Sequence, residues 1–338
     1  MKLAPSTFII TILLPLTLLV LATLPWIGEH TLAWNVITRP DSNELDAIIF
    51  WQIRVPRVLL AMLAGMGLSL GGVVFQAIFR NPLATPFTLG VAGGGSLGVA
   101  LSIFLGISFT FLGISSVSIA ALIGAITSIT IVYGISKATG NTSPNTMLLG
   151  GVAISFFFSS LILLLQYLSD ISDSFRVIHW LMGNLSNASS DSILQILPFI
   201  LSGCLITGYL HKELDLLCLH DDLAASCGLH VERMRILLFL AVSLMIAGVV
   251  TVCGPIGFVG IMAPHICRII VGPNHRHLIP ASLLFGGIFL ALCDTLARNL
   301  ATSAEIPVGV ITALLGGPFF IGLLFKKSRT SKDHPFSN

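Results

Sequence analysis

Residues 211–235, HKELDLLCLHDDLAASCGLHVERMR, form a polar interruption between two apolar segments. The stretch contains acids, bases and three histidines, and a short helical pattern begins at Asp221. The residues in its middle, Ala224 and Ala225, have small side chains. Gly228 predicts the end of the helix, because glycine adopts the left-handed conformation easily. A short helix of this kind is suited to seat against a second protein. The segments around it decide the fold class.

The composition indicates a helical membrane protein that crosses the bilayer many times. Of the 338 residues, 55% are hydrophobic and only 9% are charged, and the mean hydropathy is +0.97. Soluble domains usually carry about a quarter charged residues, and a membrane span needs roughly 20 apolar residues. A β-barrel would show short alternating segments, and the sequence has none. We therefore expect an all-α polytopic membrane protein.

We expect about ten transmembrane helices in a single domain that covers residues 1–338. The first apolar segment is long and lacks an evident signal-peptide cleavage site, so it is expected to be an uncleaved span. The eighth contains Pro255 and Pro264 and is expected to be short or broken. The approximate spans are residues 5–27, 58–79, 87–107, 116–135, 146–168, 192–210, 236–253, 254–271, 278–296 and 306–325. Polar loops are expected at residues 28–51 and, with several acids, at 169–191.

The distribution of basic residues predicts the orientation, because cytoplasmic loops are enriched in lysine and arginine. Placing both termini in the cytoplasm puts most basic residues on that side: Lys2, Arg80, Lys137, Lys212, Arg233, Arg235, Arg268, Arg276, Lys326, Lys327, Arg329 and Lys332. Five fall on the outer side: Arg39, Arg54, Arg57, Arg176 and Arg298. Residues 211–235 then form the longest cytoplasmic loop.

Enzymatic motifs are absent from the sequence. No Gly-x4-Gly-Lys-Ser/Thr loop is present to cradle a nucleotide phosphate. Gly93, Gly95 and Gly98 match Gly-x-Gly-x-x-Gly, but they lie in an apolar segment without a strand–helix–strand context. We expect them to allow close helix packing instead. We also find no nucleophile–base pair that would support an intramembrane enzyme.

The cysteines do not predict a metal site or a disulfide. None of the six forms a Cys-x-x-Cys pair, and the spacing of Cys218 and Cys227 to the nearby histidines matches no familiar zinc pattern. Most of the others fall in or near predicted spans, where cysteine usually acts as a small apolar residue. The full set is Cys204, Cys218, Cys227, Cys253, Cys267 and Cys293. We expect no bound metal.

Charged residues are nearly absent inside the predicted spans. Carriers driven by protons or sodium generally place an ionisable group at membrane depth. Asp294, Arg298 and Glu305 lie at the outer ends of the ninth and tenth spans, where they could pair with one another or face a partner. If the chain transports a substrate, its energy source is therefore expected to lie elsewhere.

Ordered motifs run along nearly the whole chain. They are Arg54-Val-Pro-Arg57, Gln76 with Asn81-Pro82-Leu83-Ala84-x-Pro86, Leu89-Gly90-Val91, Leu149-x-Gly151-Val152-Ala153, Trp180-Leu181-x-Gly183, Leu214-x-Leu216-Leu217, Cys253-Gly254-Pro255-Ile256-Gly257-Phe258-Val259-Gly260, Ala263-Pro264-His265 with Arg268, Ala297-Arg298, and Glu305-Ile306-Pro307-Val308-Gly309-Val310. In these motifs the chain resembles the permease subunits of ATP-driven importers for iron–siderophore complexes, haem and cobalamin, the FecCD type.

The resemblance implies a type II ABC importer permease fold with ten helices per subunit. It also implies a second permease subunit (the same or a related chain), two ATPase subunits and a periplasmic or lipid-anchored substrate-binding protein. ATP would be hydrolysed on the ATPase chains, so this chain is expected to bind no cofactor. The expected location is the bacterial inner membrane, and no nucleic acid is expected as a partner.

The resemblance also assigns roles to individual residues. Arginine suits docking on carboxylates because its planar fork pairs with them. Docking of the binding protein is expected at Arg54, Arg57 and Arg298. Coupling to the ATPase is expected within residues 211–235, at Asp221, Leu223, Ala224, Ala225 and Gly228. Cytoplasmic gates are expected at Asn81 and Leu83 and at Thr142 and Ser143.

The expected function is import of ferric siderophore complexes, with haem or cobalamin import as the alternative within the same family. From another class, a self-contained secondary carrier or channel remains open. That alternative predicts uptake without an ATPase and a functional charge at membrane depth.

Overall fold

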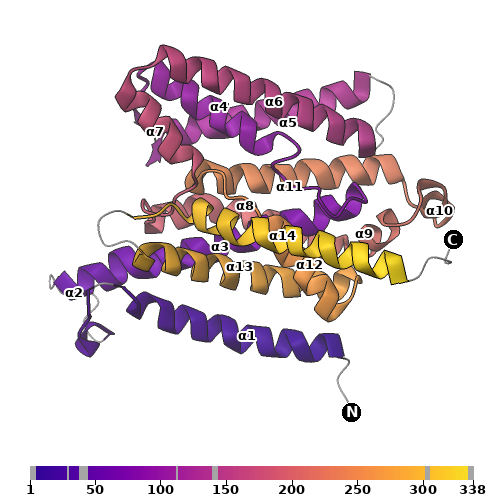
Figure 1. Cartoon of the computed structure of the whole chain (residues 1–338), viewed down its shortest axis with the longest axis horizontal. Coiled ribbons are helices and arrows are strands. Elements are labelled where there is room, and N and C mark those ends of the chain that lie inside the picture. Colours follow the sequence, from indigo (N-terminus) through magenta and orange to yellow (C-terminus); the bar gives the residue numbers. More distant parts are fainter. Residues whose placement is uncertain are drawn as a thin grey trace.

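A computed structural model describes residues 5–28, 30–37, 45–111, 113–138, 144–300 and 305–333, and helices dominate it (Figure 1). The α-helices are α1 (Pro5–Thr23), α2 (Leu45–Ala47), α3 (Val55–Ile78), α4 (Val91–Phe104), α5 (Ser116–Ala138), α6 (Pro144–Leu168), α7 (Ile171–Leu181), α8 (Ser190–Tyr209), α9 (His211–Leu217), α10 (Asp221–Ser226), α11 (Val231–Cys253), α12 (Val259–Val271), α13 (His275–Leu300) and α14 (Val308–Asp333). The 3-10 helices η1 (Leu24–Trp26) and η2 (Trp34–Ile37) and the π-helical segment η3 (Ile48–Arg54) complete the helices.

The ten predicted spans correspond to ten apolar helices in the described part of the chain, of two lengths. Within the described residues, six helices are long and apolar enough to cross a membrane: Leu45–Ile78, Ser116–Ala138, Pro144–Leu168, Ser190–Tyr209, Val231–Cys253 and His275–Leu300. Four shorter apolar helices accompany them: Thr11–Trp26, Val91–Phe104, Val259–Val271 and Val308–Leu323. Helices suit this environment because every backbone polar group must be satisfied without water.

Helix α3 lies at the centre of the molecule, between α8, α11, α12 and α13 (Figure 1). It is buried along most of its length. Two glycines let its neighbours approach closely. A Cβ at Gly72 would lie 1.8 Å from the Gly260 carbonyl oxygen of α12, and one at Gly65 would lie 2.2 Å from the Gly286 carbonyl oxygen of α13. Small residues at helix contacts are typical of membrane proteins, because packing drives their association.

A second group of helices, α4, α5 and α6, packs together beside α11, at the top of Figure 1. The contact of α4 with α5 depends on small residues: a Cβ at Gly98 would lie 2.1 Å from the Ala120 carbonyl oxygen, and one at Gly94 would lie 2.4 Å from that of Gly124. The predicted packing role is thus confirmed for Gly98.

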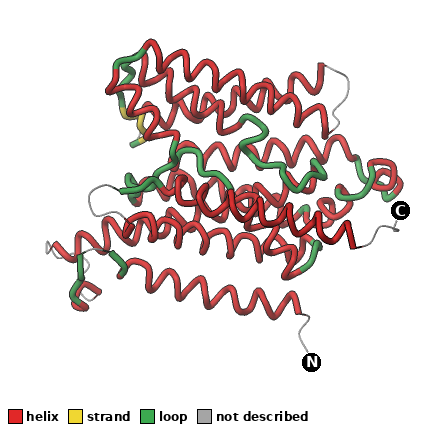
Figure 2. Tube along the Cα trace, viewed as in Figure 1, coloured by secondary structure: helices red, strands yellow, loops and turns green. Residues whose placement is uncertain are grey.

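Three segments differ from the sequence prediction. Residues 171–181, expected in an acidic loop, form α7; its acids obscured an apolar pattern that includes Phe175 and the buried Val177. The helix that contains α3 begins at Leu45, because α2 and η3 run into it without a break. A two-stranded hairpin joins β1 (Thr110–Phe111) to β2 (Ile114–Ser115) ahead of α5 (Figure 2).

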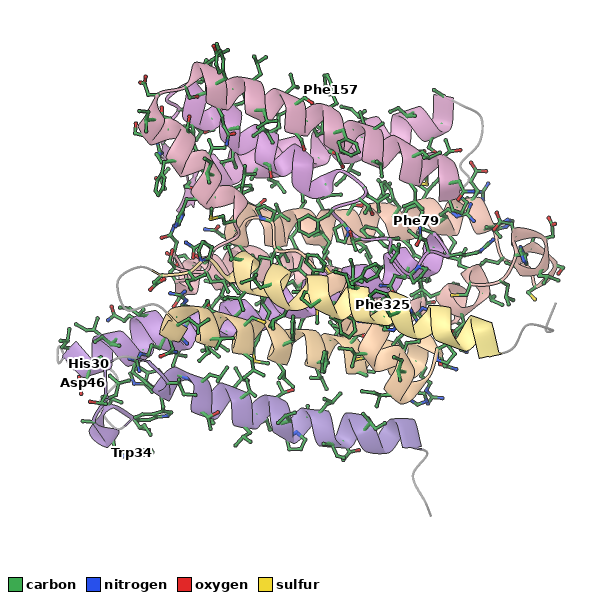
Figure 3. All side chains as sticks on the ribbon, in the orientation of Figure 1. His30, Trp34, Asp46, Phe79, Phe157 and Phe325 are labelled. Carbon is green, nitrogen blue, oxygen red and sulfur yellow. The ribbon has the colours of Figure 1, made fainter. Side chains whose placement is uncertain are left out.

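The two ends of the bundle carry different elements. The start of α1, the end of α14 and the short helix α10 lie at one end, on the right of Figure 1. The opposite end carries α2 and α7. Figure 3 marks the same division: the ion pair of His30 with Asp46 lies at the α2 end, and Phe79, the last residue before Arg80, lies toward α10. This arrangement agrees with the predicted topology, in which both termini and residues 211–235 share one side.

Candidate functional site

Within residues 211–235, two short helices, α9 and α10, lie outside the long spans, and residues 231–235 form the first turn of α11. Helix α10 ends at Ser226, and Gly228, two residues further on, has a φ of 85°, in the left-handed region. The Gly228 and Leu229 amides donate to the carbonyls of Ala225 and Ala224, at 2.9 and 3.2 Å, as in a Schellman motif. The predicted helix and its glycine end are therefore confirmed.

The residues predicted for coupling lie on two faces of α10. Ala224 is fully buried against the rest of the chain. Leu223, in contrast, is 56% exposed, and Ala225 and Gly228 are exposed as well. No atom lies within 4 Å of the position a Gly228 Cβ would take. Leu223, Ala225 and Gly228 are thus exposed beside the buried Ala224, and they are free to meet another protein.

Asp221, the first residue of α10, faces inward and pairs with two arginines. Its carboxylate accepts a hydrogen bond from the Arg80 guanidinium. Arg235 Nη2 donates to both oxygens of the same carboxylate, at 2.9 and 3.2 Å. Burial raises the pKa of Asp221, but the hydrogen bond from Arg80 and the nearby charge of Arg235 outweigh it, and the pKa lies below the usual range for aspartate. The carboxylate is therefore held in its charged form.

Helix α9 is attached to the same part of the bundle. Arg80 Nε donates to the Leu217 carbonyl oxygen at 2.9 Å, where α9 ends. Asp215 Oδ1 accepts from the His275 backbone amide at 3.0 Å and lies 2.6 Å from His275 Nδ1, at the start of α13. Sequence reasoning missed Asp215 and His275 as partners, and it counted Arg80 and Arg235 only as indicators of orientation.

The predicted gate residues Asn81 and Leu83 follow Arg80 directly. Asn81 Oδ1 accepts from the Leu83 amide at 2.9 Å, and the Ala84 amide donates to the Asn81 carbonyl oxygen at 3.0 Å. Leu83 is 43% exposed. This turn is tight and self-contained, and its role as a gate stays a prediction. The other predicted gate residues, Thr142 and Ser143, lie outside the described residues.

Arg54, predicted to dock the binding protein, is buried at the opposite end of the bundle. Its guanidinium donates to the carbonyl oxygens of Pro25, Trp26 and His30, at 3.3, 3.4 and 2.8 Å. Gly28 leaves room for the guanidinium, because a Cβ there would lie 2.5 Å from Arg54 Nη2. Arg54 thus joins the loop after α1 to the helix that contains α3.

Arg57 and Arg298 share a buried carboxylate, Asp294. Arg57 Nε lies 3.1 Å from both Asp294 oxygens, and Arg298 Nε lies 3.3 Å from Asp294 Oδ2. Arg57 Nη1 also donates to Glu305 Oε2 at 2.8 Å. Pairing of Asp294 with Arg298, one of the two arrangements expected from the sequence, is confirmed, whereas Glu305 pairs with Arg57. Glu305 is the member open to solvent, with a side chain 53% exposed. Docking by these arginines stays a prediction.

Three motifs that are distant in the sequence meet near this end. A Cβ at Gly183 would lie 2.5 Å from the Pro255 carbonyl oxygen, and one at Gly309 would lie 2.0 Å from that of Met182. The Asn184 amide donates to the Cys253 carbonyl oxygen at 2.9 Å. The glycines of these motifs therefore bring the ends of α7, α11 and the start of α14 into backbone contact.

A model of the FecCD transport family matches residues 10–326 of this chain. The chain belongs to the FecCD transport family.

Individual FecCD relatives match along most of their length. The iron(3+)-hydroxamate import system permease protein FhuG of Bacillus subtilis (strain 168) is 36% identical over 285 residues, which are 83% of this chain and 84% of FhuG. The hemin transport system permease protein HmuU of Yersinia pestis is 35% identical over 301 residues, which are 89% of this chain and 90% of HmuU.

A solved structure, described as a metal-chelate type ABC transporter in an inward-facing conformation, matches this FecCD chain with a TM-score of 0.85 and 32% identity. The match covers 95% of this chain and 99% of that chain. The chain is therefore a multi-pass ABC importer permease with the type II fold, as its motifs predict.

The Asp294 cluster generates a prediction about stability. Asp294→Asn removes the charge that two buried arginines share, and breaking a buried pair by removing one partner costs about 3–5 kcal/mol. The free energy of unfolding, measured in detergent, is expected to fall by that amount. The matched control is Asp173→Asn, whose pair with Arg176 is exposed and contributes about 0–1 kcal/mol. Equal losses in the two variants would contradict the structural role of the cluster.

Proposed function

We propose that this FecCD permease is the membrane-spanning translocation subunit of an ATP-driven importer for ferric siderophore complexes in a bacterial inner membrane. The observation that supports it best is the nearly full-length match to an iron-hydroxamate permease and to a metal-chelate type transporter. Basic residues in the loops favour cytoplasmic termini.

The partners follow from the same proposal. A second permease subunit, the same or a related chain, would complete the pathway, and the whole chain would act as one transmembrane domain. Two ATPase subunits would bind on the cytoplasmic side, where the uncharged residues Leu223 and Ala225 of α10 are exposed. ATP would be hydrolysed on those subunits and this chain would bind no cofactor, which agrees with the lack of a nucleotide-binding loop in its sequence.

The binding protein would dock at the opposite end, where Arg57 and Arg298 lie. Both guanidiniums are already engaged by Asp294, which is buried. Glu305 is the exposed carboxylate on Arg57. An incoming carboxylate would therefore exchange with Glu305 rather than meet a free arginine.

Haem import is the second candidate, supported by the similarity to HmuU, and cobalamin import is a further one within the family. A self-contained carrier would need a functional charge at membrane depth. Asp294 is a buried charge within a span, but it is paired with Arg57 and Arg298 near the end of that span. We therefore favour the importer.

Reconstitution in proteoliposomes tests this function. The permease is combined with its ATPase and binding protein, and uptake of radiolabelled ferric siderophore, haem and cobalamin is compared. We expect uptake of the ferric siderophore that requires ATP and both partners. Uptake by the permease alone would refute the importer subunit, and ATP-driven uptake of haem or cobalamin alone would refute the proposed substrate.

Docking generates its own prediction. Glu305→Gln removes the carboxylate that competes for Arg57, so binding-protein affinity is expected to rise severalfold in a surface-binding assay. The buried pairs of Asp294 remain, so the unfolding midpoint should stay near that of the unmodified chain. Asp173→Asn, which removes a partly exposed carboxylate on α7, serves as the control. Unchanged or weaker binding by Glu305→Gln would count against Arg57 as a docking residue.

A further inference from the structure

The Asp221 carboxylate joins α10 to the nearby start of α11 and to the end of α3, which is distant in the sequence. Asp221 begins α10, Arg80 follows the end of α3, and Arg235 lies in the first turns of α11. The side chain of Arg235 is 3% exposed and that of Arg80 is 26% exposed, whereas that of Asp221 is 46% exposed. The two arginines are thus fixed within the bundle, and Asp221 reaches them from its surface.

Arg80 connects this cluster to the predicted gate. It occupies the left-handed region, with φ of 49°, which is uncommon for a residue with a side chain. Such a conformation persists when the surroundings hold it. The surroundings here are Asp221 and the Leu217 carbonyl oxygen, both bound by the Arg80 guanidinium. The next residue, Asn81, starts the turn that contains Leu83.

We propose that Asp221 is the positioning residue that transmits movement of α10 to the turn at Asn81–Leu83 and to α11, through its ion pairs with Arg80 and Arg235. The inference rests on the proposed function, in which an ATPase moves α10. It assigns to Arg80 and Arg235 a task that neither motif spacing nor topology indicates.

Ion pairs are suited to transmitting movement because their hydrogen bonds are short and directional. Here one carboxylate also bonds to two arginines. Ala224 is the one buried residue of α10. The apolar contacts of α10 with the bundle therefore offer little resistance when α10 slides along it. A carboxylate that accepts from two guanidiniums fixes both distance and direction, because each bond requires its own alignment. Helix α10 cannot then move away from the bundle without moving the end of α3 or the start of α11, or breaking the pairs.

The test compares Asp221→Asn with Asp222→Asn in the reconstituted complex of permease, ATPase and binding protein. Asp222 is the neighbouring acid on α10, and it makes no ion pair within the described part of the chain. For Asp221→Asn we expect substrate uptake to fall at least tenfold while ATP hydrolysis and co-purification of the ATPase persist. Asp222→Asn is expected to keep the uptake and the ratio of ATP hydrolysed to substrate of the unmodified complex.

A conservative variant separates transmission from mere stability. Asp221→Glu keeps the carboxylate and should recover most of the uptake. A glutamate variant no better than the asparagine variant would count against charge pairing. Normal uptake per ATP in Asp221→Asn would overturn the proposal.

Thiol labelling reports the movement itself. Cys218 and Cys227 are the exposed cysteines, and Cys227 directly follows α10. In a Cys218→Ser background, Cys227 reports on α10, and Leu83→Cys reports on the turn. In this background, with Asp221 intact, ATP should change the labelling rate at both positions. When Asp221→Asn is added, ATP should change the labelling rate only at Cys227. An equal ATP response at the turn in both backgrounds would overturn the proposal.

The unmodified complex, measured in the same series, separates this proposal from the proposed function. ATP-driven uptake by the unmodified complex together with unchanged coupling in Asp221→Asn refutes the role of Asp221 alone. Uptake without the ATPase refutes the proposed function, and the role of Asp221 with it.

Discussion

The burial of α3 is the constraint on which the remaining structure depends. A helix enclosed by α8, α11, α12 and α13 cannot shift without displacing several neighbours, because protein interiors are close-packed. Glycine contacts such as Gly72 with Gly260 bring backbones together and leave no room for side chains to adjust. Each end of this helix carries an arginine held by a carboxylate, Arg57 by Asp294 and Arg80 by Asp221. The central helix is therefore tied to its surroundings at both ends.

The ion pairs at the two ends of α3 differ in how strongly they resist separation. Asp294 is almost completely buried, so separating it from its arginines would leave unpaired charges without water, which is strongly unfavourable. Asp221 and Glu305 are partly exposed and their pairs can exchange at lower cost. This distribution suits a protein that keeps its core fixed while its two surfaces bind and release other subunits. In the proposed function, docking and coupling would then depend on opposite ends of the same helix.

Much of the fold was predictable because membrane spans depend on local hydropathy. Helix α10 and its end at Gly228 were also predictable, since a glycine stop is a local signal. Helix α7 was missed because Asp170 and Asp173 obscured its apolar residues. The pairing of Asp221 with Arg80, 141 positions away, could not be predicted, because such contacts depend on how helices pack rather than on spacing. For the same reason the sequence did not show that Asp294 already pairs with Arg57, although pairing among Asp294, Arg298 and Glu305 was one of the two arrangements that it allowed.

Site-specific photo-crosslinking in the assembled complex tests most directly whether α10 contacts the ATPase. A photoreactive side chain at position 223 would replace the exposed Leu223 of α10, and one at position 171 would replace Ile171, which is 91% exposed on α7 at the opposite end. We predict that position 223 crosslinks to the ATPase subunit and that position 171 does not. A crosslink to the ATPase from position 171, or none from position 223, would contradict both the orientation and the coupling role of α10.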